Sequence, residues 1–188
     1  MGIIKGGQMK KLCKILPIAL IFCFMVGCQD KAAMAELEEF KAKAELEEQN
    51  KALVLKWVEE QDKGNIDVFL DLFAPDFLYY DPSNSPNPKS KEETYEYLIG
   101  GFKLFKKVNH KIEEIIAVDD KVIVRAICHF AHEGEFQGIP VTGKETELSE
   151  IVILKIRDGK VIEAREETDK LGWFQQLGFE LKPKEEER

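Results

Sequence analysis

The sequence of 188 residues is poor in positive charge. Lysine and arginine number 27 against 35 aspartates and glutamates, which gives a net charge of -8. The first 27 residues hold four lysines and no acidic residue, so the remainder carries 23 basic against 35 acidic residues, a net charge of -12. Nucleic-acid binding depends on Lys and Arg side chains that neutralise phosphates, so this balance argues against a nucleic-acid partner.

The sequence also lacks the common motifs of metal and phosphate sites. It has no His-Glu-x-x-His, no paired-cysteine motif and no glycine-rich phosphate loop. His129 and His132 lie three residues apart in a predicted strand, so their side chains face opposite sides and do not chelate one metal ion. We therefore predict neither a metal site nor a cofactor.

No apolar run is long enough for a membrane span, but the N-terminus has the features of a secretory signal. A basic segment at 9–14 precedes an apolar run at 15–26, about a dozen residues, whereas a transmembrane helix needs roughly 20. The next residue pair completes Met-Val-Gly-Cys at 25–28, which resembles a bacterial lipobox. The resemblance implies a signal peptide at 1–27, a lipid on Cys28 and a protein anchored to a membrane of the cell envelope. An uncleaved anchor, with Cys28 incidental, is the alternative.

Cysteine is scarce beyond this segment. After cleavage and acylation only Cys128 would remain as a thiol, so no intrachain disulfide is expected. Cys128 lies in an apolar, β-branched run, which favours a small buried hydrophobic role.

Residues 28–50 are predicted to form a helical, charged spacer. They are rich in Ala, Glu and Lys, which are strong helix formers, and pairs of opposite charge recur at helical spacing. A globular domain follows at 51–180, and residues 181–188 form a charged tail.

The periodicity of the domain predicts an α+β fold. Helices are expected at 53–64, at 66–73 with Asn65 as N-cap, after the capping box at 90–93, and at 170–177. Strands are expected at 76–81, 108–118, 121–136, 145–156 and 161–168. Because three helices precede a run of antiparallel strands, the helices must cover one face of the sheet. A strongly curved sheet that is closed by helices encloses a hollow suited to a ligand.

Four segments of the domain form a set of family motifs. They are Ala-Pro-Asp-Phe at 74–77, His-Glu-Gly-Glu-Phe-Gln-Gly-Ile-Pro-Val-Thr-Gly-Lys at 132–144, Ile-Arg-Asp-Gly-Lys-Val at 156–161 and Asp-Lys-Leu-Gly-Trp-Phe-Gln-Gln-Leu-Gly at 169–178. Together they resemble the SnoaL-like polyketide cyclases, also called ester cyclases. The resemblance implies the cone-shaped barrel of nuclear transport factor 2, in which three N-terminal helices pack on a curved antiparallel sheet. It also implies a small apolar carbonyl ligand in the cone.

The resemblance assigns roles to particular residues. In characterised members the closing Asp is the acid/base of a cofactor-free intramolecular aldol cyclisation, and here that position is Asp169. His132 matches the hairpin His and is expected to hydrogen-bond a substrate oxygen. Tyr80, Phe136 and Trp173 are expected to contact the substrate, and Trp173 would help to raise the pKa of Asp169 by excluding water.

Each assignment has a structural alternative. Asp169 stands where a helix begins, and an N-cap carboxylate accepts backbone N–H bonds that lower its pKa and oppose a role as base. His132 equally suits the closing of a hairpin. Two functions therefore remain open, an ester cyclase-type enzyme and a non-catalytic ligand-binding or assembly module on the same fold. A homodimer through the open face of the sheet is implied by the family.

Overall fold

The computed structural model describes residues 7–136, 138–180 and 182, with side chains described from residue 31 onward. The chain divides into two compact units, Met1–Glu45 and Leu46–Arg188. Helix α1 (Gly7–Asp62) includes all of the predicted spacer, and the prediction for Cys28 concerns a side chain outside those described. Within the described residues no helix has an apolar stretch long enough to cross a membrane.

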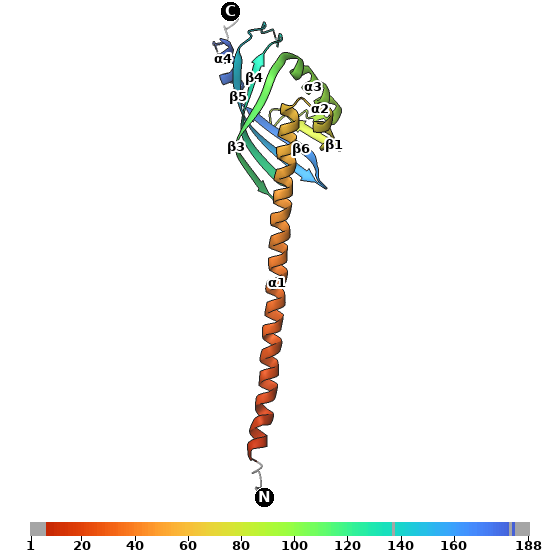
Figure 1. Cartoon of the computed structure of the whole chain (residues 1–188), viewed down its shortest axis with the longest axis vertical. Helices are drawn as coiled ribbons and strands as arrows, with labels where there is room; N and C mark the ends of the chain where they lie inside the picture. Colours follow the sequence, from red (N-terminus) through yellow and green to blue (C-terminus); the bar gives the residue numbers. More distant parts are fainter. Residues whose placement is uncertain (1–6, 137, 181, 183–188) are drawn as a thin grey trace, which may run out of the picture. The chain divides into compact units, whose positions relative to one another are not determined.

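The second unit is built on one curved sheet of six strands in the order β2-β1-β6-β5-β4-β3 (Figure 1). The strands are β1 (Phe73–Tyr80), β2 (Lys89–Ser90), β3 (Phe105–Val118), β4 (Lys121–His132), β5 (Glu145–Arg157) and β6 (Lys160–Thr168). The α+β class and the curved sheet are as predicted, but the sheet is mixed rather than antiparallel, because β1 runs parallel to β6. The sheet is also open, with β2 and β3 at its edges.

Three further helices accompany α1 in this unit: α2 (Ile66–Asp71), α3 (Lys91–Leu104) and α4 (Lys170–Leu177). The predicted capping box starts α3, since the Ser90 hydroxyl accepts from the Glu93 amide and the Glu93 carboxylate accepts from the Ser90 amide. Asn65 occupies the predicted N-cap position of α2, but its side chain does not make the capping hydrogen bond. The Asn65 side chain donates to the Glu60 carboxylate at 2.8 Å and makes no capping bond to α2.

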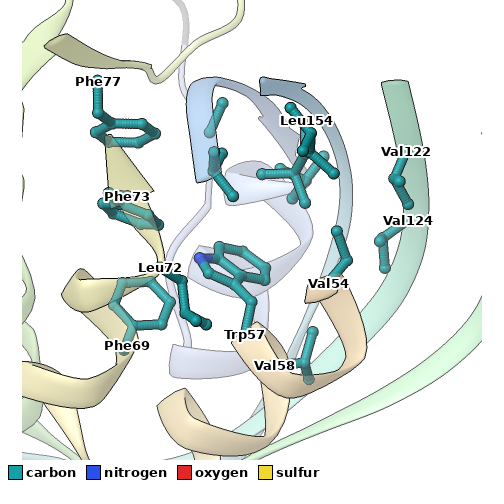
Figure 2. Close-up of a cluster of buried hydrophobic side chains, with 14 of the residues drawn as sticks. Val54, Trp57, Val58, Phe69, Leu72, Phe73, Phe77, Val122, Val124 and Leu154 are labelled. Atoms are coloured by element: carbon teal, nitrogen blue, oxygen red, sulfur yellow. The ribbon is translucent and has the colours of Figure 1, made fainter. Parts of the chain in front are cut away.

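The core joins the helices to the inner face of the sheet (Figure 2). An aromatic row runs from α1 to β1, with Trp57 beside Phe69, Phe69 beside Phe73, and Phe73 stacked on Phe77 with ring centroids 4.0 Å apart. Alternate residues of β4 and β5 bury their side chains in this core, and β6 adds Val161 and Ala164, which lie three residues apart where the pairing with β5 shifts register. The period of two therefore defines one face of each strand that meets the helices and another that points outward.

The curvature of the sheet has a local cause in β3. The pairing of β3 with β4 shifts register between Lys106 and Asn109 and again between Ile112 and Glu114, and Lys107 has a φ of 56°. Such bulges bend a strand and increase its twist. The bent sheet wraps around the helices and leaves space between its inner face and α1, α2 and α3.

Candidate active site

The second unit contains a cavity of about 640 Å³ between the inner face of the sheet and the helices. Its wall is largely aromatic. The aromatic residues of the wall are Trp57, Phe69, Phe73, Phe77, Tyr79, Tyr97, Phe102, Phe105, Phe130, Phe136, Trp173 and Phe174. A cavity of this size and composition suits a small, mainly apolar organic molecule.

Two carboxyl groups enter this apolar space from neighbouring strands. Glu150 of β5 is buried and points to the inner face, like Val152 and Leu154. Val152 pairs with Glu166 of β6, so Glu166 lies on the same inner face, while Glu167 points to the other side and is exposed. Cross-strand pairing rather than charge pattern thus selects which of the two consecutive glutamates reaches the cavity.

The environment of Glu166 favours its protonated form. Burial, and then the neighbouring Glu150 carboxyl, raise the pKa of Glu166 to about 7. The Tyr79 hydroxyl donates to Glu166 at 2.5 Å, which lowers the pKa but does not offset the burial. A carboxyl group with a pKa near 7 is well suited to exchange protons with a substrate at neutral pH.

Burial also raises the pKa of Glu150, and the nearby Asp62 adds to this effect while His110 opposes it. The two glutamates therefore influence each other's titration. Two carboxyl groups that share a dry site ionise one at a time, so one is an acid while the other is a base.

A histidine and an aspartate form a second polar group in the cavity wall. The Asp62 carboxylate accepts from the His110 backbone N–H at 3.0 and 3.1 Å and contacts the His110 Nδ1 at 2.5 Å. The side chain of His110 is 4% exposed. Burial alone would lower the pKa of His110, but the bond to Asp62 and the neighbouring Cys128 and Glu150 raise it to about 10.

The sequence did not identify these groups as a site. Asp62 and His110 lie 48 residues apart, and Tyr79 and Glu166 lie 87 apart. Consecutive glutamates at 166 and 167 are typical of a solvated strand edge, and nothing in the sequence distinguishes them. One signal was available in β5. Glu150 occupies the same alternate positions as the apolar residues Val152 and Leu154, so it is expected on the inner face with them.

The structure places Asp169 outside this group. Asp169 is the N-cap of α4, and its carboxylate accepts from the Gly172 N–H at 2.8 Å. Its side chain is exposed and does not line the cavity. The structural alternative for Asp169 is thus realised in the fold, whereas its predicted acid/base role stays a prediction.

His132 is completely buried beside the cavity rather than in its wall. Its Nδ1 lies 3.1 Å from the Thr142 hydroxyl, and its ring packs against Phe105 and Trp173. Its Nε2 has no hydrogen-bond partner among the described residues. This position joins the two arms of the hairpin, while hydrogen bonding to a substrate stays a prediction.

Two of the three residues predicted to contact substrate lie in the cavity wall, namely Phe136 and Trp173. Tyr80 does not, because side chains alternate along β1 and its neighbour Tyr79 takes the inward position. The Tyr80 ring instead lies under the Arg165 guanidinium at 3.9 Å. Among the described residues, no group of three His, Cys, Asp or Glu side chains is arranged to hold a metal ion.

Comparison with known proteins identifies a family for this domain. The model of the SnoaL-like polyketide cyclase family matches residues 52–177, which is about two thirds of the chain and includes every cavity residue. No curated protein matches the sequence.

Solved structures with the same fold come from several bacteria. AclR from Streptomyces galilaeus, named as a candidate hydroxylase, is similar with a TM-score of 0.66 and 26% identity, over 73% of this chain and 91% of AclR. A candidate SnoaL-like polyketide cyclase from Jannaschia sp. CCS1 has a TM-score of 0.63 and 27% identity, over 70% and 92%. IdmH from Streptomyces antibioticus, a candidate polyketide cyclase, has a TM-score of 0.63 over 70% and 99% of the chains. Its identity of 22% shows a common fold alone.

Proposed function

The chain belongs to the SnoaL-like polyketide cyclase family, and we propose that it binds a small apolar carbonyl compound in the cavity and performs cofactor-free acid/base chemistry on it. The observation that carries this proposal is the pair of carboxyl groups, Glu150 and Glu166, inside a largely aromatic cavity. Burial raises the pKa of both groups, and that of Glu166 to about 7. An apolar ligand would fill the remaining volume and keep water away from them.

In the proposed reaction, the Glu166 carboxylate removes a proton from the carbon next to a carbonyl group. That carbon then forms a bond to a second carbonyl carbon of the same molecule. The double bond of this second carbonyl becomes a single bond, and its oxygen becomes an alkoxide. Glu166, now protonated, returns this proton to the alkoxide. The return of the proton regenerates the Glu166 carboxylate, so the step consumes no co-reactant.

The family resemblance assigns the acid/base role to Asp169, and one experiment separates the two assignments. We propose proton exchange of 2-tetralone, a small apolar ketone, followed by NMR in deuterated water. Glu166→Gln should lower the exchange rate by about a hundredfold or more, since a positioned base contributes about 10²–10⁴-fold. The control Glu167→Gln changes the neighbouring, exposed carboxyl and should leave the rate unaltered.

The Asp169→Asn variant provides the opposing outcome. Loss of exchange in Asp169→Asn together with full exchange in Glu166→Gln would transfer the role to Asp169 and refute our assignment. Because Asn caps a helix nearly as well as Asp, this variant is expected to fold normally.

A non-catalytic ligand-binding or assembly module is the second candidate. It is favoured by the engagement of the Asp169 carboxylate in a helix cap, which leaves the family's acid/base position occupied by a structural bond. Saturable binding of 2-tetralone by wild-type protein without any proton exchange would support this module and exclude the enzyme.

Two further proposals concern where the protein acts and in what assembly. We propose that a diacylglyceryl group on Cys28 holds the mature chain on a membrane of the cell envelope, which the apolar run at 15–26 and the lipobox support. We also propose a homodimer through the outer face of the sheet. Ile123, Ile151 and Ile153 are exposed there on the paired strands β4 and β5, and contiguous exposed apolar surface favours association.

A further inference from the structure

His110 reaches the interior of the cavity because small residues lie between it and β5. His110 of β3 pairs with Cys128 of β4, and Glu150 of β5 pairs with Ala126 of β4. The side chains of Cys128 and Ala126 are short, so they leave room above the inner face of the sheet at this point. The His110 imidazole and the Glu150 carboxyl approach each other across it, with Nε2 and Oε1 3.6 Å apart.

The orientation of the His110 ring is set from the other side. Asp62, the last residue of α1, holds both the backbone N–H of His110 and its Nδ1. With Nδ1 occupied, the Nε2–H is the ring donor that remains for the cavity, where it faces Glu150 and the Cys128 thiol. Burial raises the pKa of the Cys128 thiol, so this neighbour is neutral at neutral pH. The imidazole is therefore a fixed donor whose direction depends on Asp62.

The indole N–H of Trp57 is another buried polar group beside this cavity. The indole Nε1 of Trp57 is buried and has no hydrogen-bond partner among the described residues, although Trp57 lines the cavity and is 9% exposed. Figure 2 shows this nitrogen on the edge of the ring that faces Phe73 and Leu72. Trp57 precedes Asp62 by little more than one turn of α1. An unpaired buried N–H costs stability unless a ligand or water accepts from it.

We infer that His110 is the residue that binds the ligand's carbonyl oxygen as that oxygen gains negative charge, and that Asp62 is its positioning residue. The inference rests on the proposed function and adds the group that stabilises the enolate which Glu166 would generate. His110 keeps both of its protons throughout and makes or breaks no covalent bond. The ligand class that follows is an apolar molecule with an enolate or phenolate oxygen.

Two carboxyl groups and the Cys128 thiol face the His110 ring. Asp62 of α1 supplies the only carboxylate within hydrogen-bond distance of the ring among the described residues, because Glu150 of β5 lies beyond that distance. Burial raises the pKa of Glu150, whereas the positive charge of His110 opposes this effect. A charge-assisted N–H···O⁻ bond in such an apolar site is stronger than a neutral one.

The test uses 4-nitrophenol, whose phenolate absorbs visible light while the neutral phenol does not. Wild-type protein should bind the phenolate in preference to the phenol, so binding should lower the apparent pKa of the probe. In His110→Gln the affinity for phenolate should fall about ten- to a hundredfold, the range expected for one hydrogen bond to a charged group. Asp62→Asn should lower this preference as well, because the ring of His110 would lose its positioning partner.

Two controls keep the result interpretable. His129→Gln removes a histidine that is 46% exposed and outside the cavity, so this variant should bind phenolate like wild type. Should His110→Gln fail to fold, NMR of wild-type protein gives the answer directly. The His110 ring should remain doubly protonated from about pH 6 to pH 8, whereas loss of a proton near the ordinary value for histidine would overturn the inference.

The outcomes separate this inference from the proposed function. Binding of the 4-nitrophenolate by wild type and His110→Gln with equal affinity would overturn the role of His110 and leave the apolar cavity as the ligand site. Absence of binding to wild type in either form would refute the proposed function and, with it, the inference.

Discussion

The pKa of Glu166 makes a sharp prediction about stability. In the unfolded chain this carboxyl has its ordinary pKa of 4.5, whereas in the folded protein burial and the Glu150 carboxyl raise the pKa to about 7. Between these values the folded protein binds a proton that the unfolded chain has lost. The contribution of Glu166 to the free energy of unfolding must therefore fall as pH rises from 4.5 through 7.

The magnitude follows from the same two values. Each pKa unit corresponds to about 1.4 kcal/mol, so the ionisation of Glu166 costs the folded state about 3 kcal/mol at pH 8 relative to pH 4. The Glu166→Gln variant cannot ionise at this position, and its amide oxygen still accepts from the Tyr79 hydroxyl. The two proteins should thus be similarly stable at about pH 5, and the variant should be more stable by about 2–3 kcal/mol at about pH 8.

Urea denaturation of both proteins across this pH range measures the difference. His110, whose pKa is also raised, is present in both, so its contribution cancels in the comparison. Glu167→Gln is the matched control, because this neighbour points away from the cavity and should follow the wild-type curve in parallel. Parallel curves for wild type and Glu166→Gln would show that Glu166 has an ordinary pKa and would refute the reasoning.

The remaining predictions concern the cap, the anchor and the dimer. Asp169→Ala should cost about 1 kcal/mol in urea denaturation and Asp169→Asn much less, because Asn keeps the bond to the Gly172 N–H; equal losses would contradict the cap. Cys28→Ser should move the protein from the detergent phase to the aqueous phase, and unchanged partitioning would contradict lipidation. Ile151→Lys should convert dimers to monomers in sedimentation velocity, whereas an unchanged mass would exclude this face as the interface.

Local patterns predicted most of the elements. The helix 170–177 has the observed bounds of α4, and the capping box at Ser90 starts α3 as predicted. Both signals depend on residues within one or two turns of each other, so no distant contact was needed to recognise them. The prediction for 121–136 was too long, because the chain leaves β4 at His132 and enters the hairpin.

The parallel pairing of β1 with β6 was not predictable in this way. The two strands are paired across a large part of the domain, with Phe73 opposite Val161. The turn sequences between consecutive strands indicate antiparallel neighbours, but no turn connects β1 to β6. Only the assembled sheet determines the direction in which these strands run relative to each other.

The sequence by itself determined the α+β class, the family and the hollow expected beneath the curved sheet, since these depend on periodicity and local motifs. The tertiary structure alone decided which charged groups enter that hollow. Alternation along β6 separates Glu166 from Glu167, yet only pairing with Val152 makes Glu166 the inward residue. Likewise, only the packing of the end of α1 against β3 brings Asp62 to His110. A pKa depends on burial and on neighbours in space, so these buried titratable groups could not be recognised before the chain was folded.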